Sequence, residues 1–303
     1  MKLLRIFQKL ESSNIEGLFN AQPLSKAGHR IAKNQEGFPV IMICTKKSFE
    51  NKQRFSLQNL SIQQDIECQV RDKTQIKTEF FTLIVFTNNS TELQSYFFRI
   101  AEPLLEVIPQ KPSEKDVTNI IFNFLEIFRV LLKPAKKSVL GLWGELFIIS
   151  QSVNSEQLLK AWHDNNFEKY DFGMDNWRIE VKTTIKNIRI HSFSFEQLNP
   201  INEVKVEIAS ILTKQTVSGK SIEDLCKIIR TKITNLILIN KMNLLVAQIL
   251  GDTLEEAQNI KFDLDLAIQT LRFYSTNDIP KITSIQIPPQ VYNVKFDVDL
   301  STI

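Results

Sequence analysis

The stretch from Lys169 to Thr184 constrains this chain more than any other part, because acidic and basic residues lie there on an expected β-hairpin. A turn is expected from Gly173 to Asn176, and the residues after it alternate between apolar and charged types. Successive side chains of a strand point to opposite faces, so Glu180 and Lys182 are expected to project together from one face. Asp171 lies just before the turn. The pattern therefore predicts two carboxylates and one ammonium group in one place.

The acids of this hairpin suit a magnesium ion. Magnesium prefers oxygen ligands and usually takes one or two carboxylates, with water and phosphate oxygens in its other positions. The predicted ligands are the carboxylates of Asp171 and Glu180 and the backbone carbonyl of Val181, with Mn²⁺ as a substitute for Mg²⁺. Lys182 is predicted to orient or deprotonate the attacking water and to stabilise charge on phosphorus. The same alternation also occurs on the solvated face of an ordinary hairpin, and this alternative stays open.

A second feature is an acidic residue on the apolar side of an expected helix over residues 138–151. Burying an unpaired carboxylate is costly, so Glu145 is expected to have a metal, a lysine or several hydrogen-bond donors as partner. Gly141 and Gly144 are expected to let the helix approach the sheet closely. Alternatively, Glu145 pairs with a core arginine or reaches solvent at a helix end. The residues nearest Glu145 on the helix are Gly141, Leu142, Ile148 and Ile149.

The hairpin resembles the PD-(D/E)XK nuclease superfamily, with Asp171 as the first acid and Glu180, Val181 and Lys182 as the second half of the motif. Tyr170 stands where that motif usually has proline. A longer ordered set is similar to the family of PD-(D/E)XK motif proteins called DUF4420. Its segments are Gly141–Phe147 with Glu145, Ala161–His163, Asp171–Phe172, Ile179–Thr184, and His191 through Gln197 and Leu198.

This resemblance implies a nuclease with a restriction-endonuclease-like α/β core, a central mixed sheet flanked by helices. It also implies that Glu145 lies near the metal site and assists through a second metal or through Lys182. Gln197 is expected to bind the scissile phosphate or orient the water, or alternatively to cap a helix. Relatives are associated with prokaryotic restriction or phage-defence genes, which favours a cutting subunit of a multiprotein system.

The composition limits the other functions. The chain has 303 residues and a net charge of only +3, so a nucleic-acid surface must be a local patch. It has no zinc motif and no Gly-rich ATP-binding loop, so an ATP-driven motor would be a partner protein. No apolar run is long enough for a membrane span, and the first residues do not resemble a secretion signal, so a cytoplasmic protein is expected. The cysteines, Cys44, Cys68 and Cys226, are far apart and are expected to be reduced.

Two domains are expected. Residues 1–110 are predicted to form a β-rich domain for interaction or substrate positioning, as an antiparallel meander or small sandwich, and residues 116–303 a nuclease-like domain with a C-terminal extension. The stretch from Pro109 to Lys115 is the expected linker. Expected strands are 38–45, 54–60, 65–72, 80–87, 188–195, 204–212, 272–274, 281–287 and 291–298. Expected helices are 91–107, 116–132, 138–151, and 221–250 with a break near Asn240, and 213–219 is expected to be a polar turn.

Five aromatic or basic positions near the motif also receive interpretations. Trp162 is expected to cover the sheet, and Trp177 is expected in the core. His163 is expected to make a structural hydrogen bond. Arg189 and His191 are expected either to lie near a DNA backbone or to pair with an acidic residue.

The function predicted from the sequence is a Mg²⁺-dependent endonuclease that acts on DNA, most simply double-stranded DNA. Cutting both strands usually needs two active sites, which favours a homodimer. One alternative is a catalytically silent nuclease-like scaffold that binds DNA or a partner protein. Another is hydrolysis of RNA or a different phosphodiester.

Overall fold

The structure is a computed structural model that describes residues 2–15, 17–24, 28–45, 53–71, 76–110, 112–163, 169–200 and 204–303. The chain divides into two compact units. Unit 1 contains Met1–Pro134 and Ile239–Glu255, and unit 2 contains Ala135–Leu238 and Glu256–Ile303. Unit 1 is therefore built from two stretches that are far apart in the sequence.

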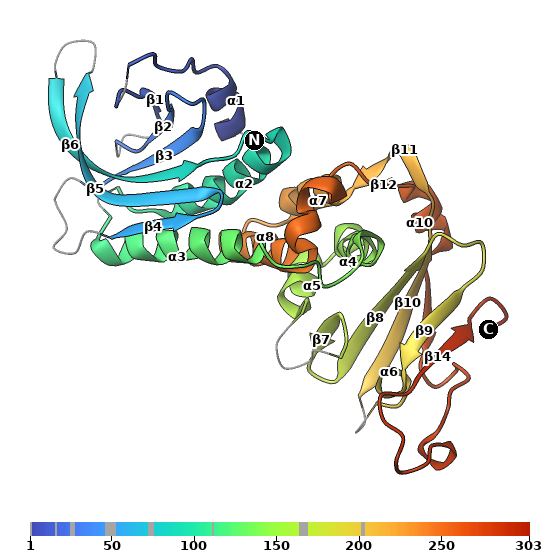
Figure 1. Ribbon diagram of the computed structural model, residues 1–303. Coiled ribbons are helices and arrows are strands. Elements are labelled where there is room, and N and C mark those ends of the chain that lie inside the picture. Colours follow the sequence, from blue (N-terminus) through green and yellow to red (C-terminus); the bar gives the residue numbers. More distant parts are fainter. Residues whose placement is uncertain are drawn as a thin grey trace. The chain divides into compact units, whose positions relative to one another are not determined.

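Unit 1 contains a six-stranded antiparallel sheet in the order β1-β2-β3-β6-β5-β4 (Figure 1). The predicted strands are present, but they form one sheet rather than a sandwich. The short first helix and the first two strands were not predicted. The elements are α1 Lys2–Gln8, β1 Asn20–Pro23, β2 Arg30–Lys33, β3 Pro39–Cys44, β4 Arg54–Leu57, β5 Leu60–Arg71, β6 Ile76–Phe86, α2 Thr91–Val107 and α3 Glu114–Val130.

Phenylalanine rings join the helices of unit 1 to its sheet. Each ring centroid lies within 6.3 Å of a neighbouring ring centroid. The rings belong to Phe7, Phe86, Phe97, Phe98, Phe124 and Phe128. Because α3 supplies two of them, it belongs to unit 1, and the predicted linker from Pro109 to Lys115 lies within this unit, with its last two residues in the first turn of α3. The division into two functional domains stays a prediction.

Helix α8, Leu236–Leu250, begins in unit 2 and continues in unit 1 from Ile239. Its Met242 is fully buried, and the Tyr96 hydroxyl donates a hydrogen bond of 2.6 Å to the Asn243 carbonyl. A 3₁₀ turn, Gly251–Thr253, and α9, Leu254–Ala257, follow it. The returning stretch is therefore part of the core of unit 1.

Unit 2 contains a four-stranded sheet in the order β13-β10-β8-β7, in which β8 and β10 are parallel and the other pairs are antiparallel. The predicted α/β class with a central mixed sheet is therefore confirmed. The elements are α4 Val139–Gln151, α5 Ser155–Ala161, β7 Phe172–Met174, β8 Trp177–Thr184, β9 Ile190–Ser194, α6 Phe195–Leu198, β10 Lys205–Leu212, β11 Gln215–Ser221, α7 Ile222–Lys232, β12 Lys261–Phe262, α10 Leu264–Thr270, β13 Arg272–Ser275 and β14 Lys295–Asp299.

Both faces of this sheet are covered (Figure 1). Helix α4 packs against β8 so closely that a Cβ atom on Gly144 would lie 1.8 Å from the Thr183 hydroxyl oxygen. A Cβ on Gly141 would touch only Ser138, so the expected close approach is confirmed for Gly144 and wrong for Gly141. The other face packs in an apolar cluster with β9, β14 and α6 that includes Phe193 and Leu198. Glu180, which projects from that face, is consequently buried rather than solvated.

Several local predictions were wrong. The hairpin turn lies at Asp175 and Asn176, because Gly173 pairs with Arg178 in the strands. The expected polar turn at 213–219 is mostly strand β11, which pairs with β12. The expected helix break lies before α8, where the Asn235 side chain accepts a hydrogen bond from the Ile237 N–H, rather than near residue 240.

The C-terminal part is less regular than predicted. The expected strand 281–287 is a loop with a 3₁₀ turn at Ser284–Gln286, and the expected strand 291–298 begins only at Lys295. Prolines at 280, 288 and 289 lack the N–H group that a sheet ladder needs. Among the described helices, none is long and apolar enough to cross a membrane.

The contact between α4 and β8 can be tested with two glycine substitutions. Gly144→Ala is expected to lower the free energy of unfolding by about 1–3 kcal/mol, because the new methyl group overlaps Thr183. Gly141→Ala is the matched control and is expected to leave stability unchanged or to raise it by up to about 1 kcal/mol. Urea denaturation measures both. Adding Thr183→Ala to Gly144→Ala should recover part of the loss, and equal effects of the two single substitutions would contradict the close contact.

Candidate functional site

Three carboxylates from separate elements of unit 2 lie in one place. Glu145 lies in the middle of α4, Asp171 directly precedes β7, and Glu180 lies in β8. These residues are only 2%, 4% and 6% exposed, respectively. The charges of Glu145 and Glu180 both act on Asp171 and raise its pKa. The structure therefore brings together the acids that the sequence singled out.

Asp171 is fixed to the edge of β8. Its Oδ2 atom accepts a hydrogen bond of 2.8 Å from the backbone N–H of Val181, and its own carbonyl accepts one of 3.0 Å from the N–H of His163. The N–H and C=O groups of one strand residue face the same neighbouring strand. The carbonyl of Val181 therefore faces the side on which Asp171 lies, where the sequence placed it as a ligand.

Lys137 joins two of the acids, and sequence reasoning missed it. Its Nζ atom lies 2.7 Å from Oε1 of Glu145 and 2.6 Å from Oδ1 of Asp171. Burial alone would lower the pKa of Lys137, but the charges of Asp171 and Glu145 raise it above the ordinary value. The requirement that Glu145 have a partner pointed to a lysine as one option, but nothing in the sequence singled out Lys137.

The second oxygen of Glu145 is also occupied. Oε2 accepts a hydrogen bond of 2.8 Å from Nε1 of Trp162 and lies 2.8 Å from Nε2 of His163. Burial would raise the pKa of Glu145, but the contacts with His163 and Lys137 outweigh it and lower the pKa below its usual range. The structural hydrogen bond expected of His163 is therefore made to Glu145, and Glu145 acts as an anchor for its neighbours.

Glu180 has a separate set of partners. Its Oε1 atom lies 2.9 Å from Nζ of Lys182 and accepts a hydrogen bond of 2.7 Å from Nε2 of Gln197. Nζ of Lys182 also lies 5.1 Å from the centre of the Phe193 ring. Gln197 accepts a hydrogen bond from the N–H of Ser194 at the start of α6. Gln197 thus caps a helix, as one alternative predicted, and also contacts Glu180, while its role toward phosphate or water stays a prediction.

The charges at this place fit a cation. Burial and the neighbouring carboxylates raise the pKa of Asp171 well above its ordinary value, and burial raises the pKa of Glu180. Among the described side chains here, three carboxylates face two ammonium groups, so one negative charge is left uncompensated. One ligand atom each from Glu145, His163 and Asp171 lie within 4.8 Å of one another. The predicted ligand set of Asp171, Glu180 and Val181 shares only Asp171 with that group and stays a prediction.

Arg189 and His191 do not belong to this site. Both are buried, and both bond to the hydroxyl of Ser210, at 2.8 Å in each case. Burial, with the charges of Lys182 and Arg189, lowers the pKa of His191 to about 4. Both side chains therefore face Ser210 in the interior rather than an exposed surface, and among the described residues neither forms an ion pair with an acid.

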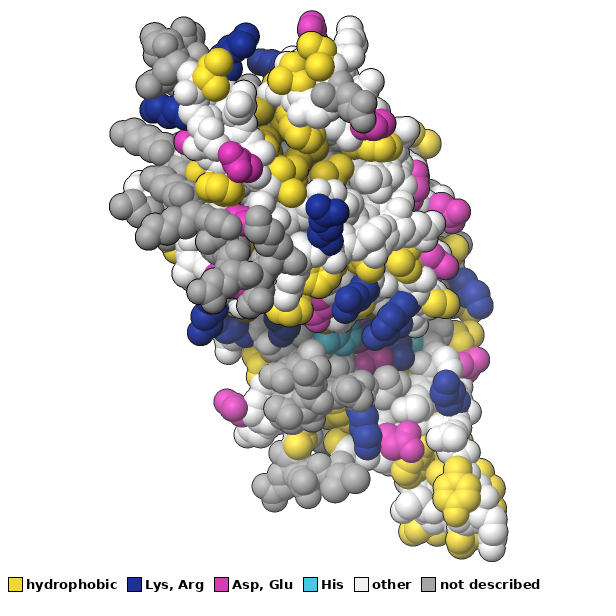
Figure 2. All heavy atoms as spheres, turned by 60° about the vertical axis from the view of Figure 1, so that its left-hand side comes forward, with side chains coloured by type: hydrophobic (Ala, Val, Ile, Leu, Met, Phe, Trp, Pro, Cys, Tyr) yellow, Lys and Arg dark blue, Asp and Glu magenta, His cyan; other side chains and the backbone are white. Residues whose placement is uncertain are grey.

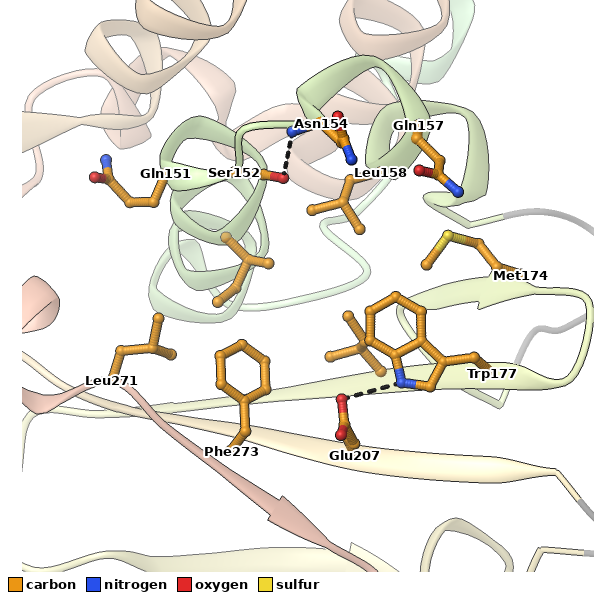
Figure 3. A pocket seen from close by; sticks show the side chains of 12 residues that line it. Gln151, Ser152, Asn154, Gln157, Leu158, Met174, Trp177, Glu207, Leu271 and Phe273 are labelled. Carbon is orange, nitrogen blue, oxygen red and sulfur yellow. Dashed lines mark hydrogen bonds between the residues drawn. The ribbon is translucent and has the colours of Figure 1, made fainter.

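A cavity of about 570 Å³ lies between the end of α4 and the sheet (Figure 3). Trp177 and Phe273 line it, and Nε1 of Trp177 donates a hydrogen bond of 3.0 Å to Glu207. Trp177 was predicted to lie in the core, but it is half-buried at the wall of this cavity. None of the described residues that line the cavity is lysine or arginine, so it does not suit a phosphate group.

Comparison with known proteins identifies one family. The family model DUF4420, described as "Putative PD-(D/E)XK family member", matches residues 4–301. No curated protein and no solved structure gives a significant match.

The raised pKa values predict how stability depends on pH when no divalent ion is present. Asp171 and Glu180 bind protons more tightly in the folded chain than in the unfolded one, so their ionisation costs stability as pH rises from the ordinary values of 3.8 and 4.5. The pKa of Glu145 is lowered instead, so its ionisation adds stability as pH rises, and it does so only below pH 4.5.

The substitution Glu180→Gln removes one of these ionisations. Its free energy of unfolding is expected to improve relative to wild type as pH rises from 4 to 8. The total change over this range measures the pKa shift, since one pKa unit corresponds to about 1.4 kcal/mol. Urea denaturation in EDTA at several pH values tests this. If the free energies of unfolding of the two proteins change with pH in parallel, the pKa of Glu180 is not raised in the folded chain.

Proposed function

This chain belongs to the DUF4420 family of PD-(D/E)XK proteins, and on that premise we propose that unit 2 is a metal-dependent endonuclease that hydrolyses phosphodiester bonds in DNA. The observation that carries the proposal is the convergence of Asp171, Glu180 and Lys182. These residues have the order and spacing of the family motif, and they lie beside a buried glutamate on a neighbouring helix.

The proposed metal ligands are the carboxylates of Asp171 and Glu180 and the carbonyl of Val181. Mg²⁺ is the proposed ion, with Mn²⁺ as a substitute, because all three ligands are oxygens. A bound divalent ion would acidify a coordinated water and neutralise charge on the phosphate. The excess negative charge of the site supports the presence of such an ion.

The protein groups have separate proposed roles. Lys182 donates hydrogen bonds to the attacking water or to a phosphate oxygen, and its contact with Glu180 holds its charge next to the metal ligands. Gln197 orients Glu180 through their 2.7 Å hydrogen bond. Glu145 acts indirectly, because its oxygens already contact Lys137, Trp162 and His163.

Local charge supports a polyanionic substrate. Figure 2 shows one face on which some lysine and arginine side chains lie close to an area where histidine and acidic side chains reach the surface. Such a patch suits a phosphate backbone although the net charge is only +3. Double-stranded DNA is the proposed substrate, and a homodimer would supply the two sites needed to cut both strands.

The proposed setting follows from the family resemblance. It is a prokaryotic restriction or phage-defence system in the cytoplasm, in which a partner ATPase or other subunits load the protein on DNA.

A second candidate function is a silent scaffold that binds DNA or a partner protein. It is favoured by the lysines, because each of the three carboxylates already contacts the ammonium group of Lys137 or Lys182. Metal binding and cleavage distinguish the two functions.

Cleavage of supercoiled plasmid tests the enzymatic proposal. With Mg²⁺ or Mn²⁺, Lys182→Ala is expected to nick the plasmid at least about 100-fold more slowly than wild type, because a group that assists proton transfer and charge stabilisation is lost. Lys205→Ala is the matched control, since Lys205 is exposed and pairs with Glu207 away from the acids. Equal nicking by wild type and Lys182→Ala would contradict the role of Lys182.

Calorimetry tests the metal site without relying on activity. Wild type is expected to bind Mn²⁺, and the double variant Asp171→Asn with Glu180→Gln is expected to lose it. Affinity should rise between pH 5 and 8, because protons compete for the two carboxylates with raised pKa values. If wild type binds no Mn²⁺ at any of these pH values, the scaffold function is supported instead.

A further inference from the structure

We propose that Lys137 is a built-in cation that fills a place formed by Glu145, His163 and Asp171, and that it limits the site to one divalent ion on the Glu180 side of Asp171. This inference rests on the proposed function and deepens it. It assigns a role to a residue outside the motif.

The first argument is geometric. The three ligand atoms of Glu145, His163 and Asp171 lie within 4.8 Å of one another, which is a spacing that a metal ion could bridge. The Lys137 ammonium contacts two of these groups, at 2.7 Å and 2.6 Å. A magnesium ion that used the two oxygens contacted by Lys137 would need to stand at about 2.0–2.1 Å from them. The ammonium group and a metal ion therefore compete for one place.

The second argument is that the two carboxylate oxygens of Asp171 have different partners. Its Oδ1 faces Lys137, and its Oδ2 faces the backbone of Val181. Glu180 contacts Lys182 and Gln197, whereas the two acids that Lys137 contacts are Glu145 and Asp171. A metal on the Glu180 side can use Asp171 without displacing Lys137.

The third argument concerns how firmly the ammonium is held. Lys137 directly precedes Ser138, whose hydroxyl caps α4 by accepting a hydrogen bond of 3.1 Å from the N–H of Gly141. The same helix carries Glu145, so the lysine backbone and its partner are fixed on one rigid element. A tethered group has a high effective concentration, which favours it over a free ion in solution.

The fourth argument is the charge balance. With three carboxylates and two ammonium groups, the described site has a charge of −1, so one divalent ion brings it to +1 and a second would bring it to +3. Without Lys137 these values become −2, 0 and +2. Removal of Lys137 should therefore strengthen binding of the first ion and admit a second.

Mn²⁺ titration calorimetry on the full chain tests this inference, with stoichiometry as the readout. Wild type and Lys137→Arg are expected to bind one ion per chain, and Lys137→Met is expected to bind two, or one at least tenfold more tightly. In the Lys137→Met background, His163→Ala is expected to remove the second ion. Thermal melting adds a second readout, because Mn²⁺ should raise the Tm of Lys137→Met more than that of wild type.

The outcomes separate this inference from the proposed function. If wild type binds one ion and Lys137→Met binds it with the same stoichiometry and affinity, the role of Lys137 is refuted and the proposed function stands. If neither protein binds Mn²⁺, both fail. Should Lys137→Met not fold, His163→Ala in the otherwise wild-type chain decides the question. It should bind one ion as wild type does, and loss of that ion would place the metal where Lys137 is inferred to sit.

Discussion

The repulsion among three buried carboxylates is the constraint on which the structure of unit 2 depends. Isolated charges removed from water cost several kcal/mol each unless partners compensate them. Lys137 compensates Glu145 and Asp171, and Lys182 compensates Glu180. These two lysines come from opposite ends of the site, one from the chain that enters α4 and one from the central strand. The fold therefore brings cations and anions to one place together, and neither set would be stable there without the other.

Helix α4 links this charge cluster to the packing of the sheet. Its middle carries Glu145, its N-terminal cap fixes the residue after Lys137, and Gly144 brings it against β8. The same helix thus packs on the apolar face of β8 and carries one of the carboxylates of the charge cluster. The cavity lined by Trp177 and Phe273 lies at the far end of this helix, where α4 no longer touches the sheet closely.

Sequence reasoning found those parts of the site that depend on local periodicity. Alternation along one strand put Glu180 and Lys182 on the same face, and the apolar surroundings of Glu145 showed that it needed a partner. The identity of that partner depended on tertiary packing, so Lys137 was missed. His191 was misjudged for a similar reason, because its buried partner is Ser210 in β10 and its strand pairs with β14, which is more than 100 residues later in the chain. The turn expected at Gly173 was displaced because strand pairing with Arg178 took precedence over the local preference of glycine.

The discontinuous make-up of unit 1 has a consequence for biosynthesis. Tyr96 and Asn243, which bond across its core, are 147 residues apart in the chain. At ordinary translation rates of about 5–20 residues per second, the ribosome needs on the order of ten seconds to make the intervening chain. During that interval the phenylalanine-rich core of the nascent protein lacks the helix that completes it, so its apolar surface stays open until residues 239–255 have been made.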